Sequence, residues 1–440
     1  MVKSRAEESL GANPSDAALN PADSVAMGVS AARAPNTVEP LRPGLFVALR
    51  HRDYRFLFGS FVVNQTGFWL SHISLQAFMV DLSDGDPFQV GLLTFALLIP
   101  ALLFAPIAGA LADRFSRKAI VLVCYAVVTV LAGLLGFMTV AGAMSAYRLM
   151  AFAFAMGATF AFVGPASTAI AANAVRTEDL PSAVALQSAT NNLTRVIGPL
   201  LAAPLVAVGL YGVGFFVFAV ASFIAAVLVG RMRVVNAVEQ EDLGLFQRIA
   251  MGWHHAAERK PALAGIFTAG CLSIFGIGHI AMLPIFAKDV LGDESYFPWL
   301  VAVTAFGAML GALTSGREMR PTLSKAALRL GFYGAAFAVF ALSQSLWLAF
   351  LAQFVVGYFY FAIMTGLQTL IQQLVDDSNR GRVMSLFQVA WGGLTPIGSL
   401  MMGAIAGILT ISQTLLIMAL ACIVSGLFIF RFSRQNGAAV

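Results

Sequence analysis

Long apolar stretches, separated by short polar connections, fill most of the chain beyond its first 50 residues. A helix needs about 20 mostly apolar residues to cross a hydrocarbon core of about 30 Å, and twelve stretches are long enough. The pattern therefore predicts an all-α membrane protein with twelve transmembrane helices. We expect these helices to begin near Tyr54, Pro87, Ala119, Ser145, Ser182, Tyr211, Ala262, Pro298, Thr322, Leu346, Val383 and Ser412.

The longest polar interruption between apolar stretches divides the chain into two halves of six predicted helices each. The first segment of the chain is rich in Ala, Pro, Ser and Asp and lacks a continuous apolar run, so it does not resemble a signal peptide. We expect a disordered cytoplasmic tail (1–45), an N-terminal six-helix bundle (46–230), a cytoplasmic central loop (231–261), a C-terminal six-helix bundle (262–432) and a short cytoplasmic tail (433–440).

The two halves resemble each other at a shift of about 200 residues, which predicts two pseudo-symmetric bundles. The ordered matches pair Gly109-Ala-Leu with Gly311-Ala-Leu, Gly157 with Gly357, Gly198 with Gly398, and Ser71-His72-Ile73 with Gly278-His279-Ile280.

Composition and charge support the membrane assignment. A chain of 440 residues that is 59% hydrophobic and 11% charged has too much apolar surface for one water-soluble core. The net charge of +5 comes from Lys and Arg spread through the connections, so we expect no nucleic-acid partner. With the N-terminus inside, only Arg148 and Lys288 fall on the outer side, and this asymmetry predicts that both termini are cytoplasmic.

The sequence offers no catalytic or metal-binding constellation. Cys124, Cys271 and Cys422 lie singly in apolar segments, so neither a disulfide framework nor a metal site is expected. Neither a nucleophile–base pair nor a phosphate-binding loop can be assembled. We therefore expect no enzyme activity and no cofactor.

Four predicted helices carry polar and aromatic residues at helical spacing. Polar side chains are costly in membrane helices and usually face an interior cavity, so the stripes predict a translocation pathway. The alternative is that they join helices by hydrogen bonds of about 1 kcal/mol each. The stripes are Gln65, Trp69, His72 and Gln76; Gln187, Asn191 and Arg195; Phe361, Thr365, Gln368 and Gln372; and Gln388, Trp391 and Thr395.

Arg195 lies thirteen residues into the fifth predicted helix, about 20 Å along its axis and thus near the membrane midplane. No acidic residue is expected at this depth. Arg195 either bonds neutral amides such as Asn64 and helix carbonyls, or receives an anionic substrate, or forms a long ion pair with Asp81. The second would make Arg195 a substrate-binding residue that selects cargo by charge.

Two histidines, His72 and His279, occupy matching positions in the two halves. Histidine changes charge near physiological pH, so the pair is a candidate for gating or protonation across the pathway. Helix packing through hydrogen bonds is the other interpretation.

The connection after the second predicted helix reads GALADRFSRK, from Gly109 to Lys118. It resembles the signature of the major facilitator superfamily; a charged turn that obeys the positive-inside rule is the alternative. The second copy, GALTSGREMR, lacks the Asp, which predicts an asymmetric gate. The expected gating residues are Gly109, Asp113, Arg114, Arg117, Lys118, Gly198, Pro199, Arg380 and Arg382.

Residues 164–199, RGRVMSLFQ (380–388) and GGLTPIGSL (392–400) resemble the branch of this superfamily that contains the enterobactin exporter and macrolide-efflux proteins. The resemblance implies the major facilitator fold and secondary active efflux by alternating access, usually driven by proton antiport. It also implies a monomer in a bacterial cytoplasmic (inner) membrane. The Arg that many drug–proton antiporters carry in helix four is replaced by an apolar run around Ala153, which weakens the expectation of proton coupling.

These observations predict an exporter of a small organic molecule, siderophore-like or drug-like, that is partly aromatic or anionic. The expected substrate-binding residues are Asn64, Gln65, Trp69, His72, Gln187, Asn191, Arg195, His279, Phe361, Gln368, Gln388 and Trp391. An importer of a small metabolite and a non-transporting membrane scaffold or sensor are the two alternatives.

Overall fold

The computed structural model describes residues 44, 46–233, 259–318 and 320–435. The described residues belong to one compact unit. The predicted N-terminal tail, most of the central loop and the last five residues lie outside the described residues, so the expectations for them stay predictions.

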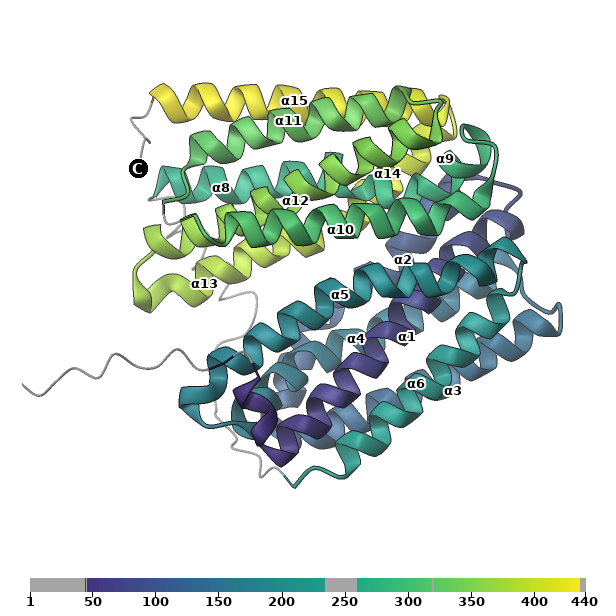
Figure 1. The fold of residues 1–440 in the computed structure, drawn as a ribbon, viewed down its shortest axis with the longest axis vertical. Helices are drawn as coiled ribbons and strands as arrows, with labels where there is room; N and C mark the ends of the chain where they lie inside the picture. The colour runs from purple at the N-terminus through teal and green to yellow at the C-terminus, as the bar shows by residue number, and fades with distance from the viewer. Residues whose placement is uncertain (1–43, 45, 234–258, 319, 436–440) are drawn as a thin grey trace, which may run out of the picture. The chain divides into compact units, whose positions relative to one another are not determined.

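Helices account for nearly all of the described chain (Figure 1). The first half contains η1 (Val47–Arg50), α1 (Arg52–Leu82), α2 (Pro87–Arg114), α3 (Arg117–Val140), α4 (Ala146–Ala174), η2 (Thr177–Asp179), α5 (Leu180–Ala207) and α6 (Tyr211–Gly230). The second half contains α8 (Lys260–Cys271), η3 (Leu272–Gly276), η4 (Ile277–Met282), α9 (Leu283–Asp289), η5 (Glu294–Tyr296), α10 (Phe297–Ser315), α11 (Leu323–Leu342), α12 (Leu346–Leu374), α13 (Asp377–Gln388), η6 (Val389–Gly393), α14 (Thr395–Ala406) and α15 (Ile411–Gln435).

Ten helical segments in the described chain are long and apolar enough to cross a membrane. Two of them are composite: α8 to α9 and α13 to α14 each run as one segment through a π-helical stretch, η3 and η6. The remaining long helices, α1 with 31 residues and α5 with 28, carry the predicted polar stripes and are therefore less apolar. Together they give twelve crossings.

The helix boundaries follow local signals in the sequence. Asp86 caps α2 by accepting a hydrogen bond from the Phe88 amide at 2.9 Å, and Pro87 occupies the first turn, where no amide hydrogen is needed. Eleven of the twelve predicted starts lie within two residues of a helix start. The exception is Val383, because α13 begins six residues earlier, at Asp377, with a polar turn that a hydropathy pattern does not detect.

Glycines let equivalent helices of the two halves pack closely. Gly157 of α4 lies against the carbonyl oxygen of Leu97 in α2, and Gly357 of α12 lies against that of Thr304 in α10. A Cβ atom at either glycine would collide with the facing backbone. The pairs α2–α4 and α10–α12 are thus related by the internal repeat.

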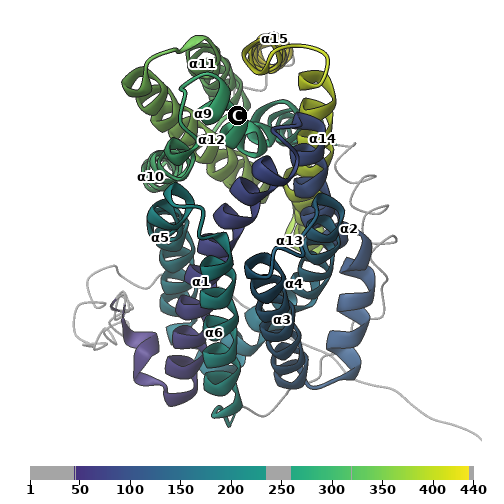
Figure 2. The same cartoon turned by 90° about the vertical axis from the view of Figure 1, so that its right-hand side faces the viewer.

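Large apolar side chains on the outer helices are exposed, as expected where a helix faces lipid. Figure 1 shows α15 beside α11, and Figure 2 shows α6 beside α1 and near α3. Val130, Phe137, Phe223 and Phe428 are among the exposed residues on α3, α6 and α15. These faces would be unstable in water, and the bilayer removes that cost.

We expect Gly311→Ala to destabilise the protein by about 1–3 kcal/mol, the range for overpacking a close contact. The added Cβ would meet the Tyr358 backbone of α12, which cannot move as a flexible side chain can. The matched control is Gly331→Ala in α11, where a Cβ meets nothing within 4 Å. Thermal unfolding in detergent, followed by size-exclusion profile, measures both variants; equal melting temperatures would contradict the packing argument.

Candidate functional site

A cavity of about 360 Å³ lies between helices of the two halves. This volume falls within the range of about 300–1,000 Å³ typical of small-molecule sites. Its wall is mostly apolar, and none of the described residues that line it is an Asp or a Glu. The lining comes from α1 (Phe68, Trp69, His72, Ile73, Gln76), α2 (Thr94, Leu97, Leu98), α5 (Arg195), η4 (Ile277, Ile280, Ala281), α10 (Phe297, Val301, Thr304, Ala305, Ala308), α12 (Gly357, Tyr360, Phe361) and α14 (Thr395, Ser399).

The Arg195 guanidinium lies between two aromatic rings on this wall. Its Cζ is 5.3 Å from the ring centroid of Trp69 in its own half and 5.2 Å from that of Phe361 in the other half. Nε is buried without a partner, and no hydrogen bond or ion pair joins Arg195 to any described residue. Asn64, one of its predicted partners, donates instead to Ser222 at 3.1 Å.

The two rings offset the cost of burying this charge without cancelling the charge itself. An Arg at the centre of a transmembrane helix costs about 2.5–3.5 kcal/mol on insertion scales. Each cation–π contact returns roughly 0.5–2 kcal/mol. The rings therefore solvate the guanidinium but do not neutralise it, and the cavity keeps a positive charge.

Gly198 explains why Arg195 reaches the ring of Trp69. A Cβ at Gly198 would strike the Cβ of Trp69 and approach the Leu70 amide to 3.1 Å, so only glycine lets α5 lie this close to α1. Arg195 precedes Gly198 by nearly one helical turn and is therefore held on the same contact. Pro199 is buried within the continuous helix α5. A hinge at Gly198-Pro199 stays a prediction.

Three more polar groups at the cavity lack partners among the described residues. They are Trp69 Nε1, His72 Nδ1 and Gln76 Oε1. The Gln76 amide nitrogen lies 3.2 Å from His72 Nε2, so in this arrangement Nε2 accepts and Nδ1 of the neutral ring carries the hydrogen. The result is two unused donors beside the guanidinium, Trp69 Nε1 and His72 Nδ1, and one unused acceptor, Gln76 Oε1.

Other predicted pathway residues lie outside this wall. Gln65 donates to Asn191 at 3.1 Å and so joins α1 to α5. Gln187 and Gln368 are partly buried and Gln388 is exposed, and none of the three lines the cavity.

His279 does not line the cavity, so the two histidines do not face each other across it as the repeat suggests. Its side chain is fully buried, with Nδ1 2.7 Å from the Gly276 carbonyl oxygen and Nε2 3.3 Å from Gln353 Oε1. The reason is η4, a 3-10 segment that turns this part of the second half differently from the continuous α1.

Trp391 supports the cavity wall from behind. Its Nε1 donates to the Tyr360 hydroxyl at 2.6 Å, and its ring packs edge-on to Phe361 with centroids 6.2 Å apart. Sequence spacing identified Phe361 but not Tyr360, which lines the cavity beside it. Adjacent residues on one helix rarely share a face, so no periodic signal marks Tyr360.

A family model described as "transmembrane secretion effector" matches residues 44–439, nearly the whole chain. The chain belongs to this family of major facilitator transporters. Its members are transporters and not enzymes.

Individual relatives are distant. The staphyloferrin A transporter of Staphylococcus aureus is 22% identical over 390 residues, covering 87% of this chain and 96% of the relative. An uncharacterised transporter of the same superfamily from Bacillus subtilis is 24% identical over 387 residues, covering 84% and 91%.

Solved structures confirm the predicted fold. A bacterial homologue of the human lysosomal transporter Spinster, in an inward-facing conformation, has a TM-score of 0.66 at 18% identity over 88% of this chain and 97% of that chain. A POT family transporter in complex with 5-aminolevulinic acid has a TM-score of 0.70 at 13% identity over 87% and 96%. At these identities the likeness establishes the fold of the transporter and nothing further.

The transporter's halves meet tightly at the end of the helices away from the start of α1. Gly91 of α2 and Gly403 of α14 face each other there, and a Cβ built on either would lie 3.2 Å from the Cα of the other. Nearby, the Tyr211 hydroxyl donates to Asp81 at 2.7 Å, and the Glu294 carboxyl of the second half lies beside Asp81. Small residues and a polar cluster thus close this end, which we call the closed side.

The predicted gating motif lies at the opposite end of the transporter. Gly109, Asp113 and Arg114 belong to the last turns of α2, and their side chains lie outside the described part of the structure. Arg117 begins α3, and Lys118 donates to the carbonyl oxygens of Gly230 at 2.9 Å and Met232 at 2.6 Å. Lys118 therefore ties α3 to the end of α6.

Two further predicted gating residues lie on α13. Arg382 donates to Asn379 at 3.0 Å, and Arg380 is exposed. Their gating role stays a prediction.

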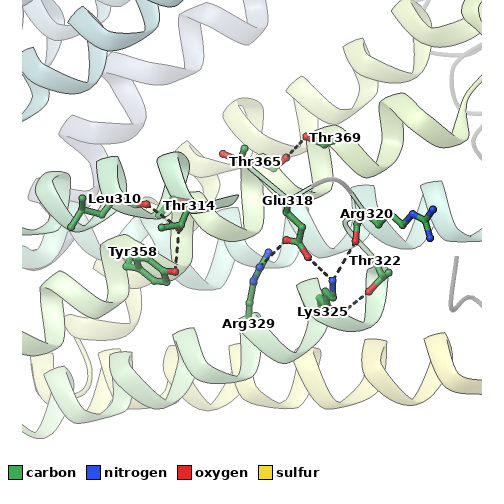
Figure 3. A network of polar contacts seen from close by, with 11 residues as sticks. Leu310, Thr314, Glu318, Arg320, Thr322, Lys325, Arg329, Tyr358, Thr365 and Thr369 are labelled. Atoms are coloured by element: carbon green, nitrogen blue, oxygen red, sulfur yellow. Dashed lines mark hydrogen bonds and ion pairs between the residues drawn. The ribbon is translucent and has the colours of Figure 1, made fainter. Parts of the chain in front are cut away.

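The second motif copy contains an ion-pair cluster that the sequence comparison missed (Figure 3). Glu318, seven residues after Gly311, accepts from Lys325 at 2.7 Å and from Arg329 at 2.8 Å. Burial opposes ionisation, but these hydrogen bonds and charges hold the pKa of Glu318 below its usual value. An acidic residue is thus present within this copy, at a shifted position, and it joins the segment after α10 to α11.

We expect Glu318→Gln to destabilise the transporter by about 1–2 kcal/mol at pH 7, because two charge-assisted hydrogen bonds are lost at a partly exposed site. A lowered pKa means that the ionised carboxylate stabilises the fold above the ordinary pKa of 4.5 and that this contribution fades as pH falls through the folded-state value. Melting temperatures of wild type and variant should therefore converge under acid conditions.

The matched control for this prediction is Asp376→Asn. Its pair with Arg259 is exposed, with side-chain exposures of 65% and 47%, and should contribute little. An equal effect of the two substitutions would assign the Glu318 result to general surface charge.

Proposed function

We propose that this transporter exports a small organic molecule by alternating access through the cavity around Arg195. One observation carries the proposal: a cavity of about 360 Å³ is lined by both halves and bounded on one side by the Gly91–Gly403 contact. Relative movement of the two halves would open that contact and expose the cavity to the closed side. A non-transporting scaffold would have no need for unpartnered polar groups inside the membrane.

Export is favoured over import by the family. Its description names secretion, and one relative is a transporter of staphyloferrin A, which makes a siderophore-like cargo our first candidate class.

The Lys and Arg residues concentrate at the end where α1 begins, so we assign that end and both termini to the cytoplasm of a bacterial inner membrane. The closed side is then periplasmic, and the cavity is in the state that loads cargo. We assign transport to the monomer.

Transport by the purified protein in liposomes tests the direction. Candidate compounds should accumulate in inside-out vesicles that contain the transporter, and accumulation should fall strongly in a Gly91→Leu, Gly403→Leu variant. Bulky side chains at this crossing would keep the halves from closing the periplasmic side. Accumulation only in right-side-out vesicles would establish an importer, and no movement of any compound would favour the scaffold.

The family resemblance implies proton coupling. Among the described residues that line the cavity, His72 is the one whose ordinary pKa lies near physiological pH, so a proton that is carried through the cavity would bind there. We expect His72→Gln to flatten the dependence of export on the pH gradient. We expect His279→Gln to act on stability instead, because it breaks a buried contact with Gln353.

The measurement compares export at two imposed pH gradients in each variant, with the melting temperature as the second readout. A gradient dependence that survives His72→Gln would move the coupling site to the Asp81–Glu294 cluster or to Asp113.

A further inference from the structure

Free hydrogen-bond donors gather on one wall of the cavity. Arg195 Nε and Trp69 Nε1 are enclosed and unpartnered, and both can only donate. His72 Nδ1 is a third donor in the arrangement set by Gln76. These groups come from α1 and α5, and all of them belong to the first half.

Three aliphatic hydroxyl groups elsewhere on the wall already donate within the protein. Thr304 donates to the Leu300 carbonyl at 2.7 Å, Thr395 to that of Trp391 at 2.9 Å, and Ser399 to that of Thr395 at 3.1 Å. These bonds leave no hydrogen of the three hydroxyls free for a cargo, and Thr304 also lies 2.9 Å from Gln353 Oε1 on α12. The Tyr360 hydroxyl differs, because it accepts from Trp391 Nε1 at 2.6 Å and keeps its own hydrogen. The second half therefore offers mainly apolar surface, from Ile277, Ile280, Ala281, Phe297, Val301, Ala305, Ala308 and Phe361.

From these two walls we infer that the cargo is an amphipathic organic anion, with an oxygen-rich acidic head on Arg195 and Trp69 and an apolar body against the second half. The inference rests on the proposed transport function and names its substrate class. An acidic head supplies acceptors to donors that have none, and its charge balances the one cation on the described wall. A neutral cargo would leave the guanidinium uncompensated.

The apolar wall excludes small inorganic anions as the preferred cargo. Phosphate or chloride would meet the guanidinium but would leave the surface opposite it exposed to water. Phe361 contributes to both parts of the site, because its ring faces the Arg195 guanidinium and also belongs to the second half. An aromatic body next to the acidic head would fit this arrangement.

Three probes separate charge from body: naphthoate, its neutral isostere naphthamide, and acetate, which has the head alone. Binding is measured in neutral detergent through tryptophan fluorescence and thermal stabilisation, and needs no transport. We expect wild type to bind naphthoate at least tenfold more tightly than naphthamide and more tightly than acetate. Arg195→Gln should abolish the preference for naphthoate over naphthamide, and Arg195→Lys should retain part of it, because Lys keeps the charge but loses the planar fork.

The control variant is Arg148→Gln, which removes an exposed arginine bonded to the Ala143 carbonyl and far along the chain from the cavity residues. It should keep the wild-type preference. Equal affinity of wild type for naphthoate and naphthamide would overturn the inference, as would a preference that survives Arg195→Gln. If Arg195→Gln does not fold, the wild-type comparison and Arg195→Lys still decide.

Liposome transport of the same probes separates this inference from the proposed function. Selective binding of naphthoate without its transport would leave the anion site intact and reject transport as its role. Transport of neutral compounds at the same rate as anions would support the transporter and reject the anion site.

Discussion

An unpaired cation inside the membrane is the constraint around which the central site is organised. Arg195 meets two aromatic rings and no carboxylate among the described residues, so its environment solvates the charge without cancelling it. The low dielectric around it strengthens any interaction with an opposite charge. Selection for such a residue at that depth is difficult to explain by stability alone, because apolar packing would satisfy the helices at lower cost.

Close helix packing by glycine connects this site to the rest of the fold. Gly198 brings α5 onto α1 at Trp69, and Gly398 brings α14 onto the backbone of η3 at Ile274. The repeat thus preserves the contact in both halves. It does not preserve the helix, because the second half carries π-helical segments where α1 and α5 are continuous. The first half presents its polar groups on continuous helices, and the second half presents apolar residues both on the continuous α10 and α12 and on the interrupted segments at η4 and α14.

Much of the architecture can be predicted from the sequence, because the bilayer has a fixed thickness and each helix that crosses it needs an apolar stretch of about 20 residues. Stripe spacing also identifies Trp69, His72, Arg195 and Phe361, since one helical face is periodic. It cannot place His279, whose segment η4 is not α-helical. It also cannot show which donors are already bonded, because that depends on neighbours far apart in the chain.

Arg195 has an electrical consequence as well. In the proposed orientation, alternating access would connect the Arg195 charge to the cytoplasm when the cavity opens inward and to the periplasm when it opens outward. An interior-negative potential of 100 mV acts with about 2.3 kcal/mol on one elementary charge that crosses the whole drop, and with a proportional fraction on a smaller displacement, so it would favour the inward state of an empty transporter. A bound monoanion removes this bias by cancelling the charge. The voltage of the cell would then drive the return of the unloaded transporter while leaving the loaded one free to turn outward.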